Sequence, residues 1–245
     1  MVLQNLIRLQ EIDSTNNYAR GLIRSKMVSE GTVVLAYSQI SGRGQGKNGW
    51  ESQPGKNLTV SFILCPAFLM PEKQFYLSMV SALAAFDLLS AYSDGFRIKW
   101  PNDLYWENKK AGGILIENTF LGNRFEYSII GFGINLNQDS FISDAPNPVS
   151  IKQITCHEVD IDICLANLDE CLNRWLSELK ASRYGLIRQT YLASLFRMKK
   201  WSRYRSGGII FRGQIVDVDE YGRLMIEHED EVVHAYAMKE VEFIL

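Results

Sequence analysis

Basic residues set among glycines are the feature of this sequence that most directly suggests chemistry. Residues 41–50, SGRGQGKNGW, hold four glycines together with Arg43 and Lys47. Glycine has no Cβ, so this backbone can approach a ligand closely, and the two cations suit an anion. Three of the glycines match the dinucleotide pattern G-x-G-x-x-G, but Pro54 and Gly55 prevent the following helix that would hold a pyrophosphate. The segment is either a mobile surface loop with incidental charge or a loop that closes over an anion.

A second basic segment is KWPNDLYWENKKAGGILIE, residues 99–117. Its composition predicts a turn after Lys99 and Trp100 and a buried strand from Gly112 onward. Lys110 stands just before that strand, and a lysine followed by glycines suits a cation aimed at a bound anion. A hairpin with a solvated tip is the alternative interpretation.

A third segment, GFGINLN at residues 131–137, is an apolar strand that contains two glycines and then Asn135. A buried amide without hydrogen-bond partners costs about 1 to 3 kcal/mol. A plain core strand would avoid that cost, so we expect Asn135 to face a ligand.

The helices and strands that must position these segments can be predicted from hydrophobic periodicity and from the glycines and prolines that end each element. The sequence predicts an α+β fold, with a mixed sheet flanked by helices, followed by short alternating strands that form a small β-barrel. Helices are expected at 13–25, 71–93 and 163–179, and strands at 32–38, 58–64, 96–100, 112–118 and 124–136. We therefore expect a large domain at 1–198 and a small C-terminal domain at 199–245.

Composition and charge limit the function classes. The chain has 26 Lys and Arg against 28 Asp and Glu, so no overall positive field would hold nucleic acid or a membrane surface. No apolar run approaches the length that spans a bilayer. The four cysteines form no C-x-x-C pair and the three histidines do not cluster, which argues against a structural metal site. The sequence predicts a soluble, cytoplasmic protein.

Taken in chain order, DSTN, SGRGQGKNGW, KWPND with KKAGGIL, and GFGINLN resemble the biotin protein ligases. The resemblance runs from about residue 8 to the C-terminus, and KWPND followed by GIL is its most specific part. It implies a class II synthetase-like biotin/lipoate ligase catalytic domain and a C-terminal SH3-like barrel. It also implies two half-reactions: biotin and MgATP form biotinyl-5'-AMP, and a lysine of a biotin carboxyl carrier protein or domain then takes the biotin. The Mg²⁺ would be bound through the ATP phosphates, with no protein metal ligand.

The resemblance also implies roles for individual residues, with Lys110 and Arg43 as the catalytic cations. The implied biotin site comprises Ser14, Thr15, Asn16, Gln39, Arg43, Gly44, Gln45, Lys110 and Gly113. The implied ATP site comprises Arg43, Lys47, Trp50, Lys99, Asn102, Asp103, Lys110 and Asn135. Ser14 and Thr15 also fit a simpler role as helix caps, and Trp50 also fits a plain core position.

The chain departs from the common family pattern at Gln45, where many relatives carry the second arginine of Gly-Arg-Gly-Arg. One cation is missing or displaced there, and we expect Lys47 to substitute for it. The glycine loop is expected to be disordered when empty and ordered by ligand.

Two alternatives to a monofunctional biotin ligase remain in view. A lipoate protein ligase would share the fold and the adenylating chemistry, although Ser14, Thr15 and Gln39 suit a ureido ring better than an apolar dithiolane. A ligase that doubles as a DNA-binding repressor would need a helix-turn-helix domain, and DSTN begins at residue 13, so no DNA-binding role is expected. The sequence leaves the oligomeric state open, a homodimer included.

Overall fold

The structure is a computed structural model that describes residues 5–46, 48–142 and 147–245. Its main part is a seven-stranded mixed sheet, hereafter the central sheet, with strand order β1-β2-β3-β7-β6-β5-β4. Among these strands β1 and β2 pair in parallel, and the other neighbours are antiparallel. The strands are β1 (Asn5–Ile12), β2 (Thr32–Gln39), β3 (Leu58–Leu64), β4 (Phe96–Lys99), β5 (Asp103–Trp106), β6 (Lys109–Phe120) and β7 (Phe125–Ile134). The predicted α+β fold with a mixed sheet flanked by helices is confirmed.

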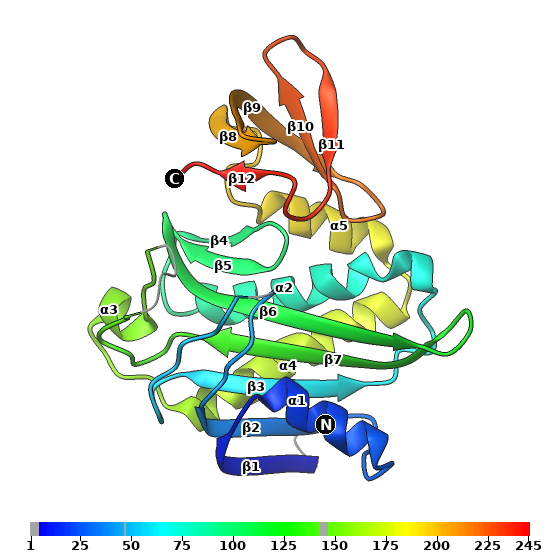
Figure 1. Cartoon of the computed structure of the whole chain (residues 1–245), viewed down its shortest axis with the longest axis vertical. Helices are drawn as coiled ribbons and strands as arrows, with labels where there is room; N and C mark the ends of the chain where they lie inside the picture. Colours follow the sequence, from blue (N-terminus) through cyan, green and yellow to red (C-terminus); the bar gives the residue numbers. More distant parts are fainter. Residues whose placement is uncertain (1–4, 47, 143–146) are drawn as a thin grey trace.

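Helices cover both faces of the central sheet (Figure 1). Helices α2 and α4 pack against each other on one face, and α1 packs on the other face against β2, β3 and β7. The helices are α1 (Thr15–Arg24), α2 (Phe75–Ser90), α3 (Ile151–Thr155), α4 (Ile161–Lys180) and α5 (Tyr184–Ala193), with a 3-10 turn at Pro71–Lys73. Among the described residues, no helix combines the length and apolar character needed to cross a membrane.

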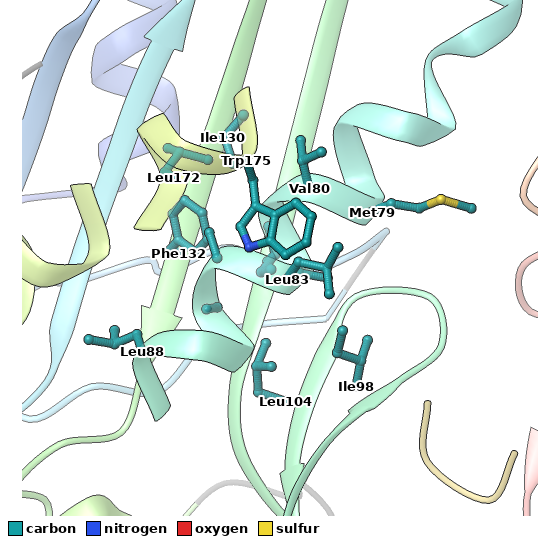
Figure 2. Packing of buried hydrophobic residues seen from close by; sticks show 14 of the residues in the cluster. Met79, Val80, Leu83, Leu88, Ile98, Leu104, Ile130, Phe132, Leu172 and Trp175 are labelled. Carbon is teal, nitrogen blue, oxygen red and sulfur yellow. The ribbon is translucent and has the colours of Figure 1, made fainter. Parts of the chain in front are cut away.

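The main hydrophobic core lies between α2, α4 and the central sheet. Figure 2 shows Phe132 of β7 beside Trp175 of α4 and Leu83 of α2. Phe132 and Leu83 are at most 2% exposed, and burying an apolar side chain of this size contributes about 1.5 to 3 kcal/mol. The indole of Trp175 keeps its polar group satisfied by donating a hydrogen bond to Asp87, 2.6 Å away. This core packs the α2 and α4 face of the central sheet. The opposite face, which carries α1, is left available for a binding site.

Side-chain alternation along β3 and β7 separates the core from a polar face. On β3, Val60 and Phe62 belong to the main core, whereas Ser61 between them contacts α1. On β7, Ile130, Phe132 and Ile134 belong to the core in the same way. Successive residues of a strand point to opposite faces, so the intervening glycines of β7 lie on the α1 face, where they leave the sheet without side chains.

A second sheet follows the central one in the chain. It has five antiparallel strands in the order β11-β10-β9-β8-β12. Its strands are β8 (Ser202–Ser206), β9 (Ile209–Val218), β10 (Leu224–His228), β11 (Val233–Tyr236) and β12 (Glu242–Phe243). The indole N–H of Trp100 donates to the carbonyl of Gly222 at 2.9 Å, which ties this sheet to the turn after β4. The expected small C-terminal β unit is present, while its SH3-like character and the division at 198/199 stay predictions.

Strands β1 and β5 and helices α3 and α5 were not predicted from the sequence. Strand β1 is an exposed edge strand, so its apolar alternation is weak. Strand β5 begins directly at Asp103, so the turn of the KWPND segment is shorter than predicted. Strand β6 begins at Lys109, so Lys110 lies inside this strand rather than before it. Helix α5 is only partly buried and carries a glycine at its second position, which weakens its sequence signal.

Candidate active site

A cavity of about 480 Å³ opens on the α1 face of the central sheet. It lies where the start of α1, the glycine loop, the turn after β4, the bare part of β7 and residues 238–243 of the second sheet meet. The predicted site residues that line it are Ser14, Thr15, Asn16, Gln39, Arg43, Gly44, Gln45, Trp50, Lys99, Asn102, Asp103, Lys110 and Gly113. The four predicted segments therefore meet in one place, together with residues 238–243, which the sequence did not indicate. Lys47 lies outside the described residues.

The start of α1 presents polar groups to the cavity. Ser14 is the N-cap residue, but its side chain makes no capping hydrogen bond. Instead, the backbone N–H of Thr15 donates to Oε1 of Gln39 at 2.8 Å. The end of β2 thus supplies the capping acceptor that the sequence analysis assigned to Ser14 or Thr15. This arrangement leaves the Ser14 hydroxyl available to a ligand.

Two polar residues that the sequence analysis missed organise this corner. Ser61 of β3 donates from Oγ to Oδ1 of Asn16, 2.6 Å away, and is fully buried. Glu117 of β6 accepts a hydrogen bond from Nδ2 of Asn16 at 2.9 Å and forms an ion pair with Nη1 of Arg43 at 3.1 Å. Glu117 also pairs with Arg20 of α1. One carboxylate therefore fixes the Asn16 amide and holds the guanidinium of the glycine loop.

The described part of the glycine loop forms a hairpin across the cavity. Arg43 and Gly49 form an antiparallel bridge, and the N–H of Gly44 donates to the carbonyl of Asn48 at 2.8 Å. The hairpin delivers Trp50 onto the bare part of β7. Its ordering by a ligand stays a prediction.

Glycines on β7 are required by the side chains that pack on them. A Cβ placed on Gly133 would lie 2.5–2.9 Å from three atoms of the Trp50 indole. A Cβ on Gly131 would overlap the Asn16 side chain, whose Cγ lies 3.0 Å away. The Trp50 indole N–H is buried and has no hydrogen-bond partner among the described residues. The two glycines thus let an amide and an aromatic ring lie directly on the sheet.

A lysine and an aspartate face each other across β5 and β6. Nζ of Lys110 lies 2.7 Å from Oδ1 of Asp103. Gly113 gives this pair room, since a Cβ there would stand 3.1 Å from the same Asp103 oxygen. The turn before β5 is held to β6 by the N–H of Ile114, which donates to the carbonyl of Asn102 at 2.9 Å. The pair places the Lys110 cation at the cavity wall, beside a carboxylate that a bound anion could replace.

Lys99 is half-buried beneath the second sheet. Its Nζ lies 3.3 Å from the hydroxyl of Tyr105 and 5.1 Å from the ring centre of Phe243. Burial lowers the pKa of Lys99 below its ordinary value of 10.5, and the nearby Asp103 carboxylate opposes that shift. A bound anion would favour the protonated lysine for the same Coulombic reason.

Asn135 is not among the described residues that line the cavity, and its role at the ATP site stays a prediction. Its side chain is buried and donates from Nδ2 to the carbonyl of Val149 at 3.2 Å. Its backbone N–H donates to the carbonyl of Ala111 at 2.9 Å. The Nδ2 group is thus bonded to the backbone, whereas Oδ1 is buried without a hydrogen-bond partner among the described residues. Through its backbone and Nδ2 bonds, Asn135 joins the ends of β6 and β7 to the segment before α3.

Comparison with known proteins agrees with this geometry. The profile of the biotin/lipoate A/B protein ligase family matches residues 8–135. A biotin–[acetyl-CoA-carboxylase] ligase of Paracoccus denitrificans is 31% identical over 226 residues, which cover 89% of this chain and 92% of that protein. The bifunctional ligase/repressor BirA of Bacillus spizizenii is 29% identical over 96% of this chain and 73% of its own length. The structure of a biotin protein ligase from Aquifex aeolicus in complex with biotin and ATP superimposes with a TM-score of 0.80, at 27% identity and 98% coverage of both chains.

The fold and the cavity define a ligase of the adenylate-forming kind, with cations gathered on the open face of a mixed sheet. The chain belongs to the biotin/lipoate A/B protein ligase family.

Replacing Gly133 by alanine tests whether Trp50 packs directly on β7. We expect Gly133→Ala to lower the free energy of unfolding by about 1 to 3 kcal/mol, because the new methyl group displaces the indole. Gly21→Ala is the matched control, since Gly21 lies in α1 and a methyl group there would meet nothing within 4 Å. That variant should be neutral or more stable by up to about 1 kcal/mol. Urea unfolding of both proteins measures the difference, and equal stability of the two variants would contradict the packing.

Replacing Lys99 by methionine tests the burial of its charge. Because the pKa of Lys99 is lowered in the folded protein, the protonated lysine disfavours folding below that pKa. This penalty disappears as the pH rises through the lowered pKa toward 10.5. We therefore expect Lys99→Met to be more stable than the wild type at pH 7, with a smaller difference at about pH 10. Urea unfolding at both pH values measures this, with exposed Lys200→Met as a control that should show no such trend.

Proposed function

We propose that this chain is a biotin protein ligase, a biotin–[biotin carboxyl carrier protein] ligase. It would form biotinyl-5'-AMP from biotin and MgATP and then transfer biotin to a specific lysine of a carrier domain. The observation that carries the proposal is the combination found in one cavity. Uncharged donors and acceptors at Ser14, Thr15 and Gln39 lie beside two cations, Arg43 and Lys110. The relatives named as biotin ligases and the similar structure with biotin and ATP support the same reaction.

The first half-reaction brings together two negative groups. A carboxylate must attack the α-phosphate of ATP, and two unit charges 4 Å apart repel by about 4 kcal/mol at an effective dielectric of 20. Arg43 and Lys110 supply fixed positive charge against this repulsion. Both cations are held in position by carboxylates, Glu117 and Asp103. Lys110 would stabilise the negative charge that grows on the oxygen between the α- and β-phosphates as pyrophosphate leaves.

In the second half-reaction the adenylate must be shielded from water and yet remain accessible to the carrier protein. The adenylate is a mixed anhydride, and the amine of the carrier lysine attacks its carbonyl carbon while AMP departs. Water would cleave the same bond. The glycine hairpin lies across the cavity and would shield the anhydride until the carrier arrives.

Magnesium would enter as part of the MgATP substrate. Among the described residues there is no group of three or more His, Cys, Asp or Glu side chains placed to hold a metal ion. The acidic residues that line the cavity are Asp103 and Glu242, and each is engaged by a basic side chain. The residues present therefore fit a metal bound through the nucleotide phosphates better than one bound by the protein.

The polar set at α1 favours biotin over lipoate as the acyl substrate. A ureido ring has two N–H donors and a carbonyl acceptor, and these match the hydroxyls of Ser14 and Thr15 and the amide of Gln39. Thr15 and Gln39 already bond to each other, but an apolar dithiolane would offer no partner to the buried Ser14 hydroxyl, at a cost of about 1 to 3 kcal/mol. Labelling a carrier domain with biotin or lipoate distinguishes the two, and preferential incorporation of lipoate would contradict the proposal. We further propose that the enzyme works in the cytoplasm on a protein partner and does not bind nucleic acid.

Biotin-dependent exchange of pyrophosphate into ATP tests the first half-reaction and the role of Lys110. The wild type should catalyse exchange only with biotin present. Lys110→Ala should lower the rate by about 10² to 10³, the usual cost of removing one transition-state donor.

Lys109→Ala is the matched control, since Lys109 precedes Lys110 on β6 and is exposed. Its exchange rate should equal that of the wild type. Equal losses in both variants would show that the effect is general to this strand, and an absence of exchange in the wild type would refute the proposed function.

A further inference from the structure

The turn between β11 and β12 brings Lys239 to the cavity. Lys239 lies in this turn with a φ of 71° and is one of the lining residues. The turn is closed by two hydrogen bonds: the N–H of Glu240 donates to the carbonyl of Ala237 at 3.0 Å, and the N–H of Ala237 donates to Oε2 of Glu240 at 2.7 Å. The backbone of the second sheet therefore fixes the base of the lysine side chain.

This turn contacts the glycine hairpin directly. Nε2 of Gln45 donates to Sδ of the neighbouring residue, Met238. Nζ of Lys239 lies above Gly46, in the space that a Cβ on Gly46 would occupy. Gly46 has a φ of 70°, which glycine adopts without strain. Close approach of the lysine thus depends on the bare backbone of the hairpin.

The basic residues of the cavity fall into two groups by their partners. Arg43 and Lys110 are paired with the carboxylates Glu117 and Asp103. Nζ of Lys99 lies over the Phe243 ring of β12, and Lys239 has no carboxylate within ion-pair distance among the described residues. The nearby Glu242 is occupied by Arg205, 3.1 Å away. Two cations without an ion-pair partner among the described residues thus lie at this side of the cavity: Lys99 at the end of β4 and Lys239 on the second sheet.

We propose that Lys239 binds the β- and γ-phosphates of ATP and the departing pyrophosphate. This assignment rests on the proposed function. Arg43 and Lys110 stand where the α-phosphate is expected, so among the described lining residues Lys99 and Lys239 are the cations left for the rest of the triphosphate. Within the described part of the hairpin, position 45 carries a neutral amide that is turned toward Met238, and the second sheet supplies a positive charge at the same place. An ammonium group suits this role, because it acts as a compact charge on a flexible stem.

Steady-state pyrophosphate exchange tests this assignment with three variants. Lys239→Ala should raise the KM for ATP and for pyrophosphate about tenfold or more, since a hydrogen bond to a charged group contributes on the order of 1.5–3 kcal/mol. The KM for biotin should stay within about twofold. Lys239→Arg keeps the charge and should recover most of the loss. Lys200→Ala removes an exposed lysine outside the cavity and should behave as the wild type.

Transfer of biotin from pre-formed biotinyl-5'-AMP to a carrier domain distinguishes a role of Lys239 at the triphosphate from a role at the adenylate. This step involves no β- or γ-phosphate, so Lys239→Ala should leave its rate unchanged. A slower transfer would place Lys239 at the α-phosphate and overturn the assignment, as would an unchanged KM for ATP and pyrophosphate. An absence of biotin-dependent exchange in the wild type would instead refute the proposed function itself.

Discussion

The close packing of Trp50 and Asn16 on a strand without side chains is the constraint on which this site depends. Gly131 and Gly133 occupy alternate positions of β7 on the face opposite the main core. The other face of the same strand is filled by Phe132 and its neighbours, which pack against α2 and α4. The strand therefore combines rigidity on one side with empty space on the other. In this sheet, that combination leaves room for a cavity on a central strand.

The cations of the cavity are kept in place by partners that an anion can replace. Lys110 lies 2.7 Å from Asp103 and Arg43 lies 3.1 Å from Glu117. Both pairs are partly exposed, so each contributes little to stability. Their role is to orient charged side chains that would otherwise sample many rotamers. When a phosphate or carboxylate binds, the charge is already at the cavity wall, and only the acidic partner has to give up a contact.

The sequence revealed the segments of the site better than the contacts between them. SGRGQGKNGW and KWPND stand out because glycine and lysine are unusual beside apolar strands, and both segments line the cavity. Ser61 and Glu117 were missed because their importance comes from residues more than forty positions away, Asn16 and Arg43. Thr59 and Ser61 alternate with Val60 and Phe62, so a polar face of β3 was visible in the pattern. The backbone partners of the Asn135 side chain were not predicted for the related reason that they lie in other segments.

The contribution of residues 238–243 to the cavity wall has a consequence for the order in which the protein becomes functional during synthesis. The central sheet is complete once residue 134 has emerged, and its core once α4 and α5 have packed. Domains generally fold in order from the N-terminus as they are made, so the polar face of β7 and the glycine hairpin are formed early. Yet Lys239 and Phe243 arrive among the last residues described. A nascent chain would therefore hold a folded cleft that lacks one wall, and the cavity lining would be complete only when residues 238–243 have emerged and packed.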